Sequence, residues 1–291
     1  MMFMLELLVF PKDGKKRPWV LFLMGLLYAS LSFLLVHFIF SGDVVLSRYS
    51  GLLVAVFASL FSIIFVHYAM RLDEEEDLED DEKDDIKSIM REWRILSMFL
   101  WLFLGFIVAF SFWQIAFSSS TTMNAQIETY CVLKNPLNYN SCLEQQASIN
   151  PLNGIDTTPQ GSFSAIFMNN FTVFLFIIFF SLLFGAGSIF ILAWNASIIS
   201  VVIGISTNYN LSNFFLGISR FMIHGIPEIA AYFIAAMSAG ITSFALMGYF
   251  NNAITKDNLR KIIRHALMFL LVGIFVLALG ALIEVYITPL I

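Results

Sequence analysis

Seven apolar stretches constrain this chain more than any other feature, because each has the roughly 20 residues that a helix needs to cross a bilayer. They occupy residues 19–40, 51–70, 95–117, 163–184, 188–206, 228–247 and 266–288. Charged residues make up 13% of the chain and hydrophobic residues 59%, and a water-soluble globule has no place for so much apolar surface. We therefore predict an all-α, polytopic transmembrane bundle of about seven spans. A soluble enzyme, a secreted disulfide scaffold and a nucleic-acid-binding protein are excluded as interpretations of the whole chain.

The boundary between the fourth and fifth stretches depends on the sequence Gly185-Ala186-Gly187. Residues 157–219 contain no charged side chain, so charge does not mark the boundary. A tight turn at the two glycines divides this region into two spans of normal length. One overlong helix followed by a truncated one is the alternative, and we predict the turn.

Basic residues are distributed asymmetrically among the loops. Of the 16 Lys and Arg residues, 13 lie in the segments 12–17, 71–94 and 256–264, which share one side of the membrane if there are seven spans. Loops rich in Lys and Arg stay in the cytoplasm. We therefore expect a multi-pass protein of the cell membrane with a cytoplasmic N-terminus and an extracytoplasmic C-terminus.

The same pattern divides the chain into three segments. We expect an N-terminal two-span hairpin at 1–72, an acidic cytoplasmic linker at 73–94, and a five-span core at 95–291 with an extracytoplasmic loop at 118–162. Within the linker, Asp73–Asp85 holds 11 acidic residues and one Lys. Like charges at this density keep a segment extended. The linker is either a solvated connection or a docking strip for a basic cytoplasmic partner.

The chain has two cysteines, Cys131 and Cys142, and both lie in the predicted extracytoplasmic loop. That compartment is oxidising, and the short separation suits a disulfide bond. The CxxC spacing of redox motifs is absent, so we predict a structural bridge.

Polar side chains inside the apolar stretches are the candidate functional residues, because an ionisable group in hydrocarbon is costly unless it is paired or faces water. The candidates are Asn169, Asn170, Asn195, Arg220, His224, Glu228 and Glu284. They are densest around Gly225 and Pro227. Residues 214–223 are too few to span, so we predict a re-entrant or interfacial helix that turns at Gly225, with Pro227 in the first turn of the sixth span.

Three interpretations of His224 and Glu228 remain open. They form a buried hydrogen-bonded pair that fastens the turn, a proton or ion site along a pathway, or a metal-binding hydrolytic site. His and Glu can ligate Zn²⁺, but two ligands are too few, and nothing in the sequence brings Glu284 near as a third. The asparagines either join helices by hydrogen bonds or line a cavity. No cofactor is predicted.

The polar and glycine residues occur in an order that resembles a known family. Asn169-Asn170, Gly185-Ala186-Gly187, Asn195 and above all His224-Gly225-Ile226-Pro227-Glu228, followed by the small-residue-rich helix 229–241, resemble the stage II sporulation protein M family of integral membrane proteins. The resemblance covers roughly residues 94–288, so the first two spans look like an N-terminal addition. The family pattern marks Asn170, Asn195, His224, Gly225, Pro227 and Glu228.

The resemblance implies a role without catalysis, because the sporulation member serves as the membrane scaffold of a peptidoglycan-degrading complex and not as its hydrolase. We therefore expect a scaffold or subunit of a cell-envelope or membrane complex. The alternatives are a transporter or channel-like component that uses the buried polar cluster, and a metal-dependent intramembrane hydrolase. Expected partners are other membrane or envelope proteins, the lipid bilayer and a second copy of the chain, but not nucleic acid.

Overall fold

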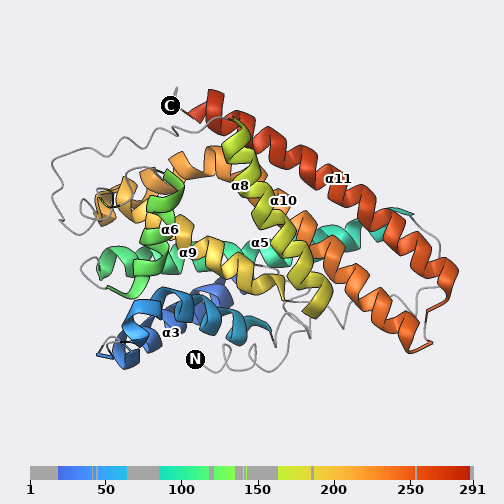
Figure 1. Cartoon of the computed structure of the whole chain (residues 1–291), viewed down its shortest axis with the longest axis horizontal. Helices are drawn as coiled ribbons and strands as arrows, with labels where there is room; N and C mark the ends of the chain where they lie inside the picture. Colours follow the sequence, from blue (N-terminus) through green and yellow to red (C-terminus); the bar gives the residue numbers. More distant parts are fainter. Residues whose placement is uncertain are drawn as a thin grey trace.

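The computed structural model describes residues 19–40, 42–43, 45–63, 85–117, 121–134, 140, 142, 163–184, 187–252 and 254–288. Within these ranges the chain is helical and contains no strand (Figure 1). This confirms the all-α fold predicted from the apolar stretches. The centre of the acidic linker lies outside the described residues.

Seven helices are long and apolar enough to cross a membrane, as predicted. The spans are α3 (Val20–Phe40), Leu46–Ile63, Ser97–Ala116 within α5 (Asp85–Ala116), Phe163–Leu183 within α8 (Phe163–Phe184), α9 (Ser188–Ser206), Gly225–Phe250 within α10 (Phe214–Phe250) and α11 (Lys256–Tyr286). The fourth and fifth spans are separate helices, since α8 ends at Phe184 and α9 begins at Ser188.

Helix α10 differs in one respect from the prediction. The predicted short helix before the sixth span is present and the span begins at Gly225, but the helix does not break there. Pro227 lies inside a continuous helix of 37 residues and not in a first turn. A proline inside a helix removes one backbone hydrogen bond and pushes against the preceding turn, which bends a helix without ending it. The ribbon of α10 accordingly changes direction between its two parts (Figure 1).

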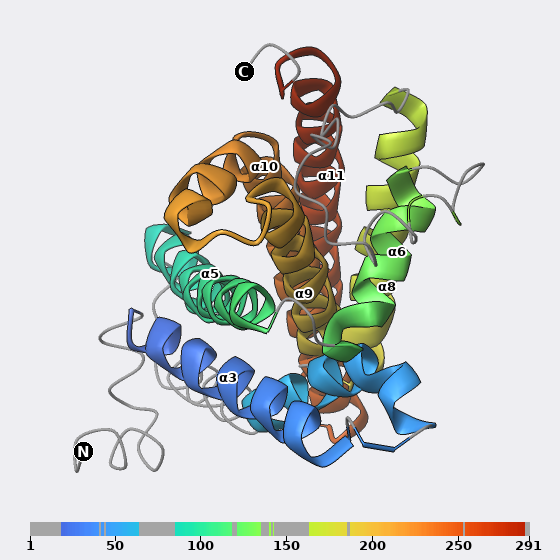
Figure 2. The ribbon, with the colours of Figure 1, turned by 90° about the vertical axis from the view of Figure 1, so that its left-hand side faces the viewer.

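The helices pack around an aromatic core. Helix α3 lies along α5, α5 also contacts α9, and α10 packs against α8 and α11 (Figure 2). Large side chains that are fully buried between them include Phe33, Phe103, Phe106, Phe110 and Phe233. The bundle buries 67% of an apolar 18-residue stretch of Gly225–Phe250, but only 22% of such a stretch in Phe163–Leu183 and 28% of one in Lys256–Tyr286. Helix α10 is therefore central, and α8 and α11 are peripheral.

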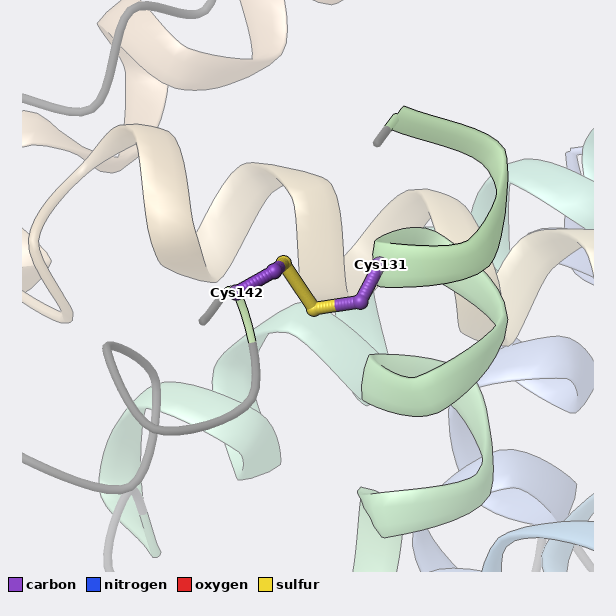
Figure 3. Close-up of a disulfide and its surroundings, with 2 residues drawn as sticks. All are labelled: Cys131 and Cys142. Carbon is purple, nitrogen blue, oxygen red and sulfur yellow. A yellow bond between two sulfur atoms is a disulfide. The ribbon is translucent and has the colours of Figure 1, made fainter. Parts of the chain in front are cut away.

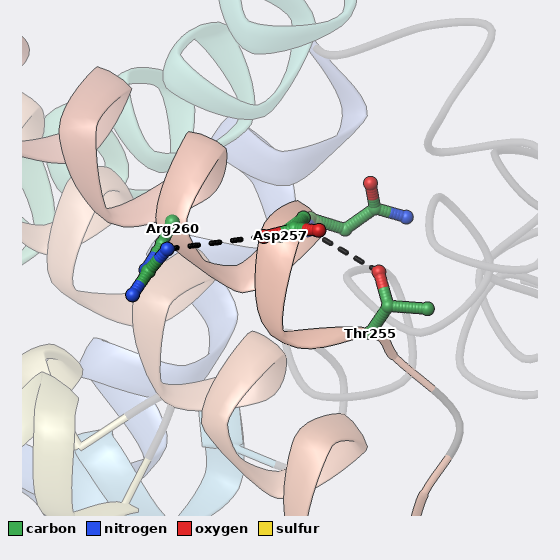
Figure 4. A network of polar contacts seen from close by, with 4 residues as sticks. Thr255, Asp257 and Arg260 are labelled. Atoms are coloured by element: carbon green, nitrogen blue, oxygen red, sulfur yellow. Dashed lines mark hydrogen bonds and ion pairs between the residues drawn. The ribbon is translucent and has the colours of Figure 1, made fainter.

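Helix α11 begins with a solvated, capped turn (Figure 4). The backbone N–H of Asn258 donates to Oγ1 of Thr255 at 3.3 Å, which satisfies one of the unpaired donors of the first turn. The guanidinium group of Arg260 lies 3.9 Å from the carboxylate of Asp257. Both side chains are mostly exposed, and such an ion pair contributes little to stability.

The loop at 118–162 contains a helix that packs into the bundle. Helix α6 (Asn124–Lys134) follows the 3₁₀ turn Thr121–Met123 and contacts α9. Met123 and Cys131 have no exposed surface. Cys131 is joined to Cys142 by a disulfide bond, with 5.7 Å between the Cα atoms, which confirms the predicted bridge (Figure 3). The bridge ties the segment after α6 to a helix that is itself anchored in the core.

Candidate functional site

Three spans meet at a polar cluster formed by Asn170 on α8, Glu228 and Tyr232 on α10, and Glu284 on α11, which we call the carboxyl cluster. Nδ2 of Asn170 donates to Oε1 of Glu228 at 2.6 Å. The carboxyl groups of Glu228 and Glu284 lie close enough to interact electrostatically with each other. The cluster therefore links all three helices through polar side chains, which is costly in a membrane unless each polar group is satisfied.

The position of the cluster follows from helix direction. Asn170 is the eighth residue of the fourth span, Glu228 is the fourth residue of the sixth, and Glu284 is the third from the end of the seventh. Since neighbouring spans run in opposite directions, the starts of the fourth and sixth spans lie beside the end of the seventh. The cluster therefore lies toward one end of the bundle and not at the midplane of the bilayer.

Close packing and a buried hydroxyl group complete the cluster. A Cβ atom added at Gly280 on α11 would lie 2.9 Å from Cγ of Glu228, so α10 and α11 approach closely at this level. Tyr232 lies one helical turn after Glu228 and is 5% exposed. Its hydroxyl group interacts electrostatically with both Glu228 and Glu284.

The other predicted site residues are distributed differently. Nδ2 of Asn195 donates to the carbonyl oxygen of Ile191 in its own helix at 2.8 Å, which places this amide outside the cluster. Asn169 is exposed and touches the cluster only through Asn170, whose Oδ1 lies 3.4 Å from Nδ2 of Asn169. Gly225 is buried, and a Cβ there would lie 2.5 Å from the ring of Phe221.

For two of the candidate residues, Arg220 and His224, the structure describes the backbone but not the side chain. Both residues belong to α10. The predicted pairing of His224 with Glu228 is therefore still a prediction, and so is a metal site at these two residues. Among the described residues, no three His, Cys, Asp or Glu side chains gather as a metal site would require.

A second buried polar site, around Gln126 on α6, was missed by the sequence analysis. Nε2 of Gln126 donates to the carbonyl oxygen of Gly51 at 2.8 Å and to Oγ of Ser197 at 3.0 Å, while its Oε1 has no partner. Nearby, Nδ1 of His37 lies 3.0 Å from Oγ1 of Thr122. These contacts fix α6 to two spans and the turn before it to a third. Gln126 stands in a polar loop sequence, and nothing in that sequence marks it as buried.

Two tyrosines, Tyr130 in α6 and Tyr209 in the turn after α9, are partly shielded from water. Burial raises the pKa of Tyr130 to about 12, with Tyr209 as a second cause. Burial also raises the pKa of Tyr209, and a hydrogen bond from Gln114 on α5 opposes that rise. Both side chains are partly buried, and the end of α6 therefore lies against the turn after α9.

Comparison with known protein families identifies the chain's relatives. The family model described as Stage II sporulation protein M matches residues 20–289. The match includes the first two spans, which the sequence resemblance had placed outside the family core. It also includes all three helices of the carboxyl cluster. No curated protein and no solved structure matches the chain.

Proposed function

The chain belongs to the stage II sporulation protein M family, and from this premise we propose that it acts as a non-catalytic integral membrane scaffold, a subunit of a membrane or cell-envelope complex. Its seven apolar helices are those of a multi-pass membrane protein. The proposal adds a role to that architecture, namely holding other membrane proteins through its spans. Other membrane or envelope proteins and a second copy of this chain are the expected partners.

The observation that carries this proposal is the exposed apolar face of α11. Its exposed side chains recur every three or four residues and therefore line one side of the helix: Met268, Leu271, Phe275, Leu279 and Leu282. Helix α11 also contacts α8, where a Cβ at Gly273 would lie 2.9 Å from the ring of Phe174. The two least buried spans thus lie together, and helices of a partner or lipid would cover them.

The proposal also includes the orientation of the chain in the membrane. We propose that the N-terminus is cytoplasmic and the C-terminus extracytoplasmic, because of the positive charge around residues 12–17, 71–94 and 256–264. The disulfide between Cys131 and Cys142 supports this arrangement, since such bonds persist on the oxidising side of a membrane. Labelling of a single cysteine introduced at Asp257 or Asn210 by a membrane-impermeant reagent tests it. Labelling of Asn210→Cys alone in intact cells is expected.

The scaffold role is tested by co-purification in a mild detergent. We expect the wild-type chain to be recovered with a defined membrane partner, and a variant carrying Leu271→Ala, Phe275→Ala and Leu279→Ala to lose it. The matched control carries Leu23→Ala and Leu31→Ala on α3, which also remove exposed apolar side chains. Recovery of the wild type without any other membrane or envelope protein, whether as a monomer or as a homodimer, would contradict the proposal. Equal behaviour of both variants would also contradict it.

A transporter or channel-like component is the second candidate, and the carboxyl cluster favours it. Buried carboxyl and amide groups near a bent helix are found at the ion sites of transporters. Ion flux into proteoliposomes that is lost in Glu228→Gln and kept in Glu128→Gln would support this candidate. No observation among the described residues favours the hydrolase alternative.

A further inference from the structure

The contact between Glu228 and Glu284 requires a positive charge. Two ionised carboxylates in direct contact repel each other, and the repulsion grows where water is scarce. Both residues lie within membrane spans, and Gly280 brings the two helices too close for a large side chain to separate them. Two ionised carboxylates have no hydrogen to share, so a hydrogen bond between the two groups would need one added proton.

The groups around the pair supply oxygen atoms and one amide. Asn170 uses its Nδ2 on Oε1 of Glu228, which fixes that carboxyl group in one orientation. The Tyr232 side chain is buried, and its hydroxyl group interacts electrostatically with both carboxyl groups. Oxygen donors of this kind suit protons and hard cations, and do not suit metals that prefer sulfur or nitrogen.

The charged groups on the surrounding helices do not supply the missing charge in the described part of the chain. Helix α8 carries no charged residue. On α11, Glu284 is itself a member of the pair, and Arg264 lies 20 residues before it. On α10, Arg220 and His224 precede Glu228 by eight and four residues, and their side chains lie outside the described residues.

We propose that Glu228, Glu284, Asn170 and Tyr232 form a binding site for one monovalent cation, held between the two carboxyl groups. The cation is either a proton shared by the two groups or Na⁺ coordinated by their oxygen atoms. In both cases the bound charge joins α10 to α11, and Asn170 positions Glu228 from α8. The site is independent of the scaffold role, because it does not require a partner protein and does not require that the ion cross the membrane.

The test is thermal unfolding of the purified full chain in detergent. The unfolding midpoint is measured against NaCl, with choline chloride holding ionic strength constant, at about pH 5 and about pH 8. If Na⁺ is the cation, the midpoint rises with NaCl at the higher pH and rises less at the lower pH, where protons compete. If a proton is the cation, the midpoint is independent of NaCl and falls as the pH rises.

Variants assign either response to this site. Glu228→Gln and Glu284→Gln each remove one charge at constant shape, and each is expected to abolish the Na⁺ or pH response. Glu284→Gln carries the test if Glu228→Gln does not fold. Asn170→Leu is expected to weaken the binding of Na⁺ by about 10- to 100-fold, as loss of a positioning partner does at other ion sites.

The control variant is Glu128→Gln, which removes an exposed carboxylate on α6 and should leave the response unchanged. For the shared proton, infrared spectra should contain a protonated carboxyl band in the wild type that Glu284→Gln lacks. The proposal is overturned if the wild type responds to neither cation. It is also overturned if Glu228→Gln and Glu284→Gln respond as the wild type does, in which case Arg220 or His224 supplies the charge.

Discussion

The α3–α5 crossing and the carboxyl cluster hold helices together by different means. At the crossing, a Cβ at Gly25 would collide with the carbonyl oxygen of Leu102 and lie 3.1 Å from Cα of Gly105. The two backbones therefore touch, and aromatic pairs such as Phe33 with Trp113, at 6.1 Å, flank them. At the cluster, Asn170 and Glu228 join their helices by a 2.6 Å hydrogen bond.

Both means of holding helices together reflect the solvent. Lipid offers no hydrophobic drive for two helices to associate, so close backbone packing and interhelical hydrogen bonds replace it. Packing tolerates almost no added volume, whereas a hydrogen bond tolerates a change of shape but not the loss of a partner. Added volume should therefore destabilise the α3–α5 crossing most, and loss of a polar partner should destabilise the carboxyl cluster.

The largest effect is expected from added volume at the α3–α5 crossing. In Gly105→Leu the new side chain would collide with the carbonyl oxygen of Phe22, which cannot move aside as a side chain can. We expect a loss of about 3 kcal/mol in the free energy of unfolding, measured by thermal unfolding in detergent. The control is Gly42→Leu, since nothing lies within 4 Å of a Cβ at Gly42. Equal effects of the two variants would show that the crossing is not tightly packed.

Removal of the disulfide should have the next largest effect. The bond between Cys131 and Cys142 closes a short loop, and opening such a loop costs about 2–3 kcal/mol in the chain-entropy model. We expect the double variant Cys131→Ala/Cys142→Ala to unfold at a lower temperature than the wild type, and no longer to respond to reductant. An unchanged midpoint would mean that the contacts of Gln126 alone hold α6 in place.

The contribution of a polar side chain to the carboxyl cluster is tested by substitution of Asn170. Asn170→Leu keeps the volume but removes the hydrogen bond to Glu228, and we expect a loss of about 1–2 kcal/mol, the upper range for such bonds in membrane proteins. Asn169→Leu is the matched control, because its side chain is exposed and should be close to neutral. If Asn169→Leu lowers the free energy of unfolding as much as Asn170→Leu does, the hydrogen bond to Glu228 does not account for the loss.

The smallest expected effect concerns the pH dependence of unfolding, through Tyr130 in α6. Because burial raises the pKa of Tyr130 from 10.0 to about 12, the folded state holds this proton more tightly than the unfolded state does. The resulting stability is complete below pH 10 and is lost as the pH rises toward 12. Thermal unfolding of Tyr130→Phe across this range should decline less steeply than that of wild type. Tyr286→Phe, which alters an exposed tyrosine, should match the wild type.

The sequence predicted the spans, the disulfide and the polar members of the cluster for physical reasons. Apolar runs of sufficient length leave few alternatives, and an Asn or Glu inside such a run is conspicuous because it is costly. That Glu284 meets Glu228 could not be deduced, because it depends on how α10 and α11 pack in register at Gly280.

The glycine contact between α3 and α5 and the place of Pro227 within α10 could not be predicted from the sequence. Gly25 and Gly105 are single glycines within apolar runs, and nothing in the sequence pairs one with the other. Pro227 after Gly225 is as compatible with the first turn of a helix as with the interior of one, and the structure has it in the interior. Tertiary packing decides such cases, because neighbouring helices can satisfy the backbone groups that a proline releases.

A double-mutant cycle between Asn170 and Glu228 tests the central claim that these two side chains join α8 to α10 at the carboxyl cluster. The free energy of unfolding is measured for the wild type, Asn170→Leu, Glu228→Gln and the double variant under one detergent condition. We predict a coupling of about 0.5–1.7 kcal/mol, the range that directly bonded pairs show in membrane proteins. Additive effects, with a coupling near zero, would contradict the claim.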